Sequence, residues 1–275
     1  MSESPPHNMR QNRYAGLSGD FRGSADSRPP LVLLHQLTCD HTIWTSCLHG
    51  LAELDPERQC LTLDLPGHGL SPGMLPHTTD HIVQLVYQAV CEAGLDSPII
   101  VGHWTSAYIA HVYAARFPVR GVISVEPLPS PIRIAGLLQS EMSRAEEVDY
   151  SKFWEMVVKD FSFDFLPLSI LETITRTCGQ HAVVGSYWQE LFDWPKDDLR
   201  DRLVTAAHAI ESARIPYLVI FGNNISPGAR ARIAEIMPTA HVEIWHQGGH
   251  FPYLGFPGRF AQRLNETSSW PVSFT

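Results

Sequence analysis

The chain has no long apolar run and no cluster of basic side chains. Its 275 residues include 20 Lys and Arg against 29 Asp and Glu, which gives a formal net charge of −9 at pH 7. A negative balance without a basic patch argues against a nucleic-acid partner. No stretch is apolar enough to span a membrane, and the N-terminus lacks the basic and apolar pattern of a signal peptide. We therefore expect a cytoplasmic protein with no membrane segment.

Cysteine is scarce and scattered. The number is odd and no C-x-x-C spacing occurs, which predicts reduced thiols and no disulfide or zinc framework; the five are Cys39, Cys47, Cys60, Cys91 and Cys178. The sequence also lacks metal-ligand spacing, a glycine-rich phosphate loop and a dinucleotide fingerprint. We expect neither a metal nor another cofactor.

Short apolar runs alternate with helical patterns along much of the chain. The runs predict strands, and the patterns between them predict helices over 80–93 and 106–117. Alternation of this kind predicts an α/β fold with a mostly parallel central sheet and helices on both faces. The expected strands cover 31–34, 60–64, 98–101, 121–125, 216–221 and 241–245.

The pattern divides the chain into three parts. Residues 1–28 are polar and predict a flexible tail, with at most a weak hairpin near 14–21. The core is expected over 29–127 and 206–275. The alternation stops over 128–205, which predicts a helical cap. Its aromatic residues, Trp154 and Trp188 among them, either fill the interior of the cap or form a pocket wall for a flat, apolar ligand.

One segment has the layout of a nucleophile elbow but lacks the nucleophile. Residues 99–110 predict a strand, a sharp turn and a helix, and Gly102 and His103 precede the turn. The position that serine takes in the G-x-S-x-G pattern is Trp104. An indole neither attacks a carbonyl nor accepts a proton at neutral pH. The sequence therefore argues against a serine hydrolase.

Four motifs in order resemble the α/β-hydrolase superfamily over nearly the whole chain. They are Leu33-Leu34-His35-Gln36-Leu37, the stretch from Asp64 to Ser71, the elbow, and Gly248-Gly249-His250-Phe251-Pro252. Within the superfamily, Cys39-Asp40-His41 with Trp44, and Gly67 to Pro72, resemble the cofactor-free 3-hydroxy-4-quinolone 2,4-dioxygenases. That resemblance implies ring cleavage by O2 with loss of carbon monoxide and without a cofactor.

Two residues are the candidates for acid–base chemistry. His250 follows the last expected strand, where this fold places its catalytic base, and imidazole titrates near neutral pH. The loop 222–226, the usual place for the acid that orients the base, has no carboxylate, so we assign that role to Glu126. The alternatives are a surface-loop histidine and a carboxylate that only marks the entry to the cap.

Backbone N–H groups of Leu37 and Thr105 are the expected oxyanion donors, because side-chain replacement does not remove them. Gln36 stands where glycine is usual, which changes that loop. His103 either binds a substrate oxygen or is a generic elbow residue, and Ser106 is expected to point away from His250. Further pocket candidates on the loop after the first core strand are Cys39 and His41, with His35 and Asp40 beside them.

Three functions are compatible with these residues. The first is deprotonation of an aromatic or enolic heterocycle by His250 and Glu126, followed by cleavage with O2 as co-substrate. The second is another non-covalent reaction of specialised metabolism, such as a lyase, isomerase or cyclase step. The third is a pseudo-hydrolase that only binds a ligand. In each case the partner is a small aromatic or apolar molecule, and the sequence leaves the oligomeric state open.

Overall fold

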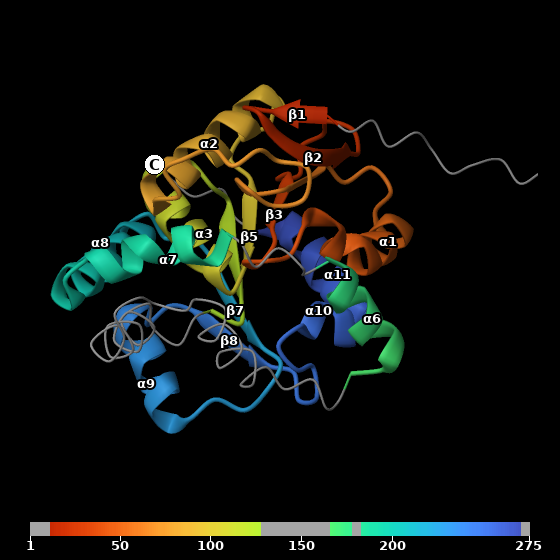
Figure 1. The fold of residues 1–275 in the computed structure, drawn as a ribbon. Coiled ribbons are helices and arrows are strands. Elements are labelled where there is room, and N and C mark those ends of the chain that lie inside the picture. The colour runs from red at the N-terminus through yellow and green to blue at the C-terminus, as the bar shows by residue number, and fades with distance from the viewer. Residues whose placement is uncertain (1–11, 128–165, 178–182, 271–275) are drawn as a thin grey trace, which may run out of the picture.

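A computed structural model describes residues 12–127, 166–177 and 183–270. These residues form one eight-stranded sheet in the order β1-β2-β4-β3-β5-β6-β7-β8 (Figure 1). Along this order, each strand from β4 through β3 to β8 pairs in parallel with the next. At one edge of the sheet, β1 pairs antiparallel with β2, and β2 pairs antiparallel with β4. The predicted α/β fold class is confirmed.

The strands lie close to where their apolar runs predict them. The core strands are β3 (Leu31–Leu34), β4 (Cys60–Leu63), β5 (Ile99–His103), β6 (Gly121–Val125), β7 (Tyr217–Phe221) and β8 (His241–Ile244). The flexible tail predicted over 1–28 is wrong for part of its length. There β1 (Asn12–Tyr14) and β2 (Leu17–Arg22) form a hairpin whose second strand pairs with β4.

Alternate residues of the strands enter two separate cores. Leu31 and Leu33 face one core, while Val32 and Leu34 face the other. The first core contains α1 (Thr45–Leu54) and α11 (Pro257–Glu266), which pack together. The second contains α2 (Thr79–Glu92) and α3 (Thr105–Arg116). Burial of both strand faces explains why the strand sequences are apolar throughout rather than alternating.

Shorter elements complete the described chain. They are η1 (His41–Trp44), α9 (Pro227–Ile236), α10 (Pro252–Gly255) and η3 (Thr267–Ser269). Among the helices of the described ranges, none combines the length and the apolar character that crossing a membrane requires.

Three helices belong wholly or partly to the segment predicted as the cap. These are α6 (Leu168–Thr177), α7 (Val184–Asp193) and α8 (Lys196–Ser212). Polar contacts attach α7 to the loop after β4 and to the start of α2. The Tyr187 hydroxyl donates to the Pro66 carbonyl at 2.9 Å, and the Glu190 carboxylate accepts the N–H of Thr79, the first residue of α2, at 2.7 Å. The rest of the predicted cap, with Trp154, lies outside the described residues.

Candidate functional site

The elbow keeps its backbone geometry although the serine is missing. Trp104 lies between β5 and α3 with φ 54° and ψ −107°, a conformation that costs a residue with a side chain about 1–3 kcal/mol. A Cβ atom on Gly102 would stand 2.2 Å from the Ser106 carbonyl oxygen, so glycine is needed for this crossing. The strained turn therefore presents a buried indole, 3% exposed, where a nucleophile would be.

His250 is buried next to this indole, in the loop between β8 and α10. Its ring lies at 80° to the Trp104 ring, with centroids 5.9 Å apart. Its Nε2 atom is 2.7 Å from Oε1 of Gln36, in the loop after β3. Burial, and secondarily the neighbouring His103, hold the pKa of His250 well below its ordinary value. The imidazole is therefore neutral at pH 7, the form in which it can accept a proton.

Glu126 does not form the expected hydrogen bond to His250. Its backbone has φ 43° just after β6, and its Oε1 accepts the Gly222 N–H at the end of β7. Within the described residues this is the only hydrogen bond of the carboxylate. Burial raises the pKa of Glu126 to about 7, and the bond from Gly222 lowers it only in part. The Glu126 carboxylate is therefore engaged with the loop after β7, which differs from the role that the sequence predicts for it.

His103 supports the loop of His250 and has no ring nitrogen left for a substrate. Its Nε2–H donates to the His250 carbonyl oxygen at 2.9 Å, because a carbonyl can only accept. Its Nδ1 therefore accepts the Tyr253 hydroxyl proton, also at 2.9 Å. Burial lowers the pKa of His103 to about 3, which keeps it neutral. Of the two roles considered from the sequence, the geometry favours the structural one. Tyr253 carries no motif by which sequence reasoning finds it.

Two backbone N–H groups remain available as oxyanion donors. Leu37 follows Gln36, and Thr105 opens α3 directly after the elbow residue. Neither backbone N–H has a hydrogen-bond partner among the described residues. The Thr105 hydroxyl is also buried without a partner within the same part of the chain. An unpaired N–H at a helix N-terminus, as at Thr105, favours an oxygen that carries negative charge.

Buried histidines connect the loop after β3, which contains Gln36 and is called the Gln36 loop below, to the loop after β4. The Nε2 atom of His35 accepts the Leu65 N–H at 3.0 Å, and the Nε2 atom of His68 accepts the Thr38 N–H at 3.1 Å. The Nδ1–H groups donate to carbonyl oxygens, so both rings are neutral. Ser106 donates to the His35 carbonyl, as expected for a serine that is not a nucleophile. The loop that presents Gln36 to His250 is therefore held from two directions.

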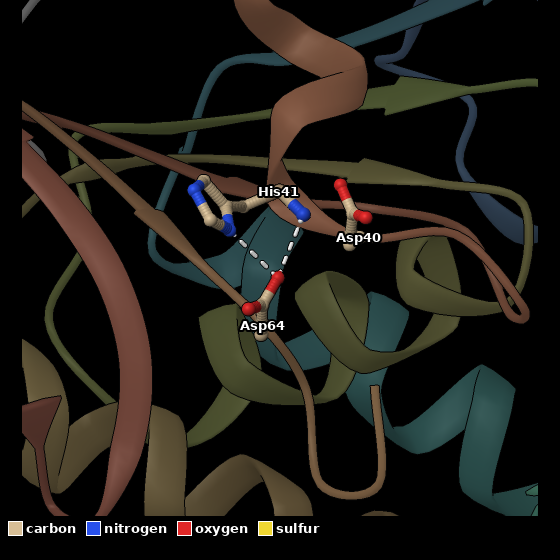
Figure 2. A group of neighbouring side chains, drawn as sticks. All are labelled: Asp40, His41 and Asp64. Carbon is tan, nitrogen blue, oxygen red and sulfur yellow. Dashed lines mark hydrogen bonds and ion pairs between the residues drawn. The ribbon is translucent and has the colours of Figure 1, made fainter. Parts of the chain in front are cut away.

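The Asp64 carboxylate forms a third attachment between the loop after β3 and the loop after β4, and it is the charged group of this attachment. Figure 2 shows its carboxylate bonded to His41, with Asp40 beside the pair and no bond drawn to it. Oδ1 of Asp64 is 2.8 Å from both the backbone N and Nδ1 of His41, and Oδ2 accepts the Leu70 N–H at 2.9 Å. Burial opposes charge on both groups. The hydrogen bond between them nevertheless raises the pKa of His41 and lowers that of Asp64.

The same three side chains offer ligand atoms within 4.8 Å of one another, a spacing that suits a metal ion. Asp64 and His41 already satisfy each other, and Oδ1 of Asp40 accepts the N–H of Thr42 at 2.9 Å as the N-cap of η1. Each of the three side chains thus already forms a hydrogen bond that stabilises the local structure. The geometry explains the cluster as an attachment between loops.

Replacing Asp64 by asparagine is expected to lower the free energy of unfolding by about 2–4 kcal/mol. The amide has one acceptor oxygen instead of two, so buried N–H groups lose a charged acceptor worth about 1.5–3 kcal/mol each. Urea unfolding at pH 7 measures the loss. Asp40→Asn is the matched control, because asparagine caps helices as well as aspartate does. Equal stabilities of the two variants would show that the Asp64 charge is not needed.

An aromatic wall adjoins the base. Trp188 of α7 is fully buried and meets Trp104 edge-on, with ring centroids 6.3 Å apart. This contact brings the cap segment to the elbow. Both rings belong to the same hydrophobic core, so the contact fits the cap-interior interpretation of Trp188 as well as the pocket-wall one.

The prediction of reduced thiols throughout is wrong at Cys39. This residue is disulfide-bonded, whereas Cys47, Cys60 and Cys91 are free thiols, so its partner lies outside the described residues. The spacing of the cysteines could not indicate this pairing, because cysteines distant in sequence are brought together only by the fold. Cys39 is consequently not a candidate nucleophile in this structure.

Comparison with known proteins identifies the family. The profile of the α/β hydrolase family matches residues 31–263. The chain belongs to the α/β hydrolase family. Among curated relatives of this α/β hydrolase, the sn-1-specific diacylglycerol lipase ABHD11 of Xenopus tropicalis is 25% identical over 270 residues, covering 89% of this chain and 79% of that one. The biotin biosynthesis bifunctional protein BioHC of Cellvibrio japonicus is 35% identical over 102 residues, but the match spans only 19% of its length.

Solved structures share the fold of this α/β hydrolase at low sequence identity. AqDC, studied for recognition and ring cleavage of the Pseudomonas quinolone signal, has a TM-score of 0.72 at 14% identity, covering 93% of this chain and 97% of that chain. The enol-lactonase of Burkholderia xenovorans LB400 has a TM-score of 0.68 at 16% identity, covering 92% and 97%. Most of the similar proteins are hydrolases, so the family indicates an enzyme without fixing the reaction.

Proposed function

We propose that this protein is a non-covalent acid–base enzyme in which His250 deprotonates a flat heteroaromatic substrate. The observation that carries the proposal is the elbow itself: its strained backbone is intact, while its tip is Trp104, next to a buried, neutral imidazole. Trp104 at this tip provides no nucleophile for covalent acyl transfer. General-base chemistry needs only the histidine and a site that stabilises the resulting anion.

The described residues supply a consistent path for the proton and the charge. The substrate hydroxyl proton moves to neutral His250. Negative charge on the substrate oxygen is stabilised by the N–H groups of Leu37 and Thr105. A buried imidazole with a lowered pKa is a weak base, so the substrate must be an enol or phenol that is itself acidic. The rings of Trp104 and Trp188 suit a flat, apolar substrate.

We propose cofactor-free ring cleavage of a 3-hydroxy-4-quinolone by O2 as the specific reaction. The substrate anion is the reductant and O2 the oxidant. One atom of O2 bonds C2 and the other bonds C4, the C2–C3 and C3–C4 bonds break, and C3 leaves with its own oxygen as carbon monoxide. Because the substrate anion supplies the electrons, the step needs no flavin or metal as reductant. The similarity in fold to AqDC, whose substrate is a quinolone signal, supports this choice among non-covalent reactions.

The proposal is tested by oxygen uptake. Chelator-treated protein is incubated with 3-hydroxy-4-quinolones that carry short or long 2-alkyl chains. We expect equal consumption of O2 and substrate, equal release of carbon monoxide, and no effect of the chelator. Substrate loss that is unchanged without O2 would instead indicate a lyase, isomerase or cyclase.

A second function, ligand binding without turnover, is favoured by one observation. Oε1 of Glu126 accepts the Gly222 N–H, so the carboxylate that the sequence assigns to catalysis has a structural bond in the loop after β7. Saturable binding of the quinolone by calorimetry, with no chemical change after prolonged incubation in air, would favour this function over catalysis.

A further inference from the structure

We propose that Tyr253 is a positioning residue for His250. Its hydroxyl selects the Nε2–H form of His103, and His103 in that form holds the main chain of His250. The proposal rests on the proposed role of His250 as the base. It gives a function to a tyrosine that no sequence motif marks and to the histidine that precedes the elbow residue.

The two ring nitrogens of His103 have different partners. The His250 carbonyl oxygen, 2.9 Å from Nε2, can only accept, so this bond requires a proton on Nε2. A neutral imidazole has a single N–H, so Nδ1 must then be an acceptor. The Tyr253 oxygen is 2.9 Å from Nδ1 and supplies the donor that this form needs. The hydroxyl of Tyr253 therefore determines which ring nitrogen of His103 carries the proton.

The opposite form of His103 would break the bond to the base. A proton on Nδ1 would leave a lone pair on Nε2 facing the lone pairs of the His250 carbonyl oxygen. His103 and Tyr253 are both fully buried, so solvent does not replace a lost bond. A buried polar group that loses its partner bears the full cost of its desolvation. The loop of His250 is thus held only while His103 keeps the form that Tyr253 selects.

The Tyr253 ring is itself held firmly by two other aromatic rings. It packs against Trp44 of η1 with ring centroids 4.2 Å apart, and against Phe260 of α11 with centroids 5.6 Å apart. Trp44 and Phe260 are fully buried as well. A ring fixed by these contacts places its hydroxyl with little remaining freedom.

Tyr253 lies between the base and the expected oxyanion donors. The loop after β3, which carries the Leu37 N–H, leads into η1, and the elbow that carries the Thr105 N–H follows His103 directly. A shift of His250 by about 1 Å relative to these donors can lower a rate about 10²-fold, even when the altered residue touches no substrate. We therefore expect the hydroxyl to affect kcat rather than substrate affinity.

The first test is ¹⁵N NMR of His103 on the full chain, which needs no turnover. In the wild type we expect Nε2 to show the protonated-type shift and Nδ1 the unprotonated-type shift across neutral pH. Tyr253→Phe keeps the ring and removes the hydroxyl. In this variant the Nδ1 shift should move to that of a nitrogen without a hydrogen bond, and part of the population should take the Nδ1–H form.

The second test is turnover of the quinolone. Tyr253→Phe should lower kcat about 10–100-fold, with KM changed by no more than about twofold. Tyr113→Phe is the matched control, because it removes the hydroxyl of another fully buried tyrosine, on α3 in the other core; it should leave both measurements unchanged. His103→Gln retains a donor and an acceptor but has no tautomer to select. Adding Tyr253→Phe to His103→Gln should therefore lower kcat little further.

An Nδ1–H form of His103 in the wild type, or the same His103 shifts in the wild type and Tyr253→Phe, would overturn the proposal. An equally large loss of kcat from Tyr253→Phe in the His103→Gln background would also overturn it, because the hydroxyl would then act through another group. If Tyr253→Phe does not fold, the form of His103 in the wild type decides. Absence of oxygen uptake by the wild type would contradict the proposed function and leave the NMR measurement intact.

Discussion

Replacing His250 by alanine is expected to lower turnover of the quinolone about 10²–10⁴-fold, with little change in affinity. Among the described residues, His250 is the histidine whose ring packs against Trp104, and burial keeps it in the neutral, proton-accepting form. Both ring nitrogens of His103 are already bonded. Loss of the base acts on the transition state, so kcat should fall much more than KM rises. Rapid-mix measurements of substrate consumption in air give kcat and KM for both proteins.

His246→Ala is the control for this variant, because His246 is an exposed histidine of the same loop. Thermal unfolding of both variants separates lost chemistry from lost folding. Full turnover in a folded His250→Ala variant would show that the proton goes elsewhere.

Glu126→Gln then tests whether the carboxylate joins the base once substrate binds. If Glu126 acts through His250, the double variant is no slower than His250→Ala alone. If the Glu126 carboxylate only bonds Gly222, Glu126→Gln acts independently of His250. The fold-losses in turnover of the two single variants then multiply in the double variant. Measurement of all three variants under one set of conditions distinguishes the two cases.

The sequence was sufficient for the framework of the site. Buried parallel strands are apolar runs, so β3 and β6 are predicted at their observed bounds. The order of motifs along those strands then places the elbow and His250 at the same edge of the sheet. These predictions succeed because local patterns and chain order determine them.

The partners of the site residues could not be predicted in the same way. Gln36 and His250 are 214 positions apart, and their contact depends on how two loops approach each other. Glu126 has the expected place after β6, yet its carboxylate accepts the Gly222 N–H. The Cys39 disulfide is likewise a result of tertiary packing. Spacing in sequence contains no signal for any of them.

Mild acid is expected to destabilise this protein strongly. Burial lowers the pKa of both His68 and His103 to about 3, and it also lowers the pKa values of His35, His111 and His250. These histidines titrate near 6.5 in the unfolded chain. Below pH 6.5 these histidines bind protons in the unfolded state but not in the folded state. The free energy of unfolding therefore falls as the pH falls toward 3. His68 and His103 alone should each cost about 2 kcal/mol between pH 7 and pH 5.

Two groups act in the opposite direction. The raised pKa values of Glu126 and His41 mean that the folded state takes up their protons first, which adds stability as pH falls. Glu126, with a pKa of about 7, offsets roughly one histidine over this interval. Burial lowers the pKa of His77 as well, so among the described residues six histidines with lowered pKa values outweigh these two groups. Since the whole free energy of unfolding of a domain is about 5–15 kcal/mol, we expect loss of the fold near pH 4.

Urea unfolding at intervals from pH 7 to pH 4 measures this dependence. His68→Gln removes one titrating group and should reduce the slope by about 1.4 kcal/mol per pH unit in the acid range. The histidines that fasten the Gln36 loop are neutral because their Nε2 atoms accept backbone N–H groups. A protonated ring would place a donor against a donor at each of these bonds. A stability that stays flat down to pH 5 would therefore contradict the assignment of these rings as obligatory acceptors.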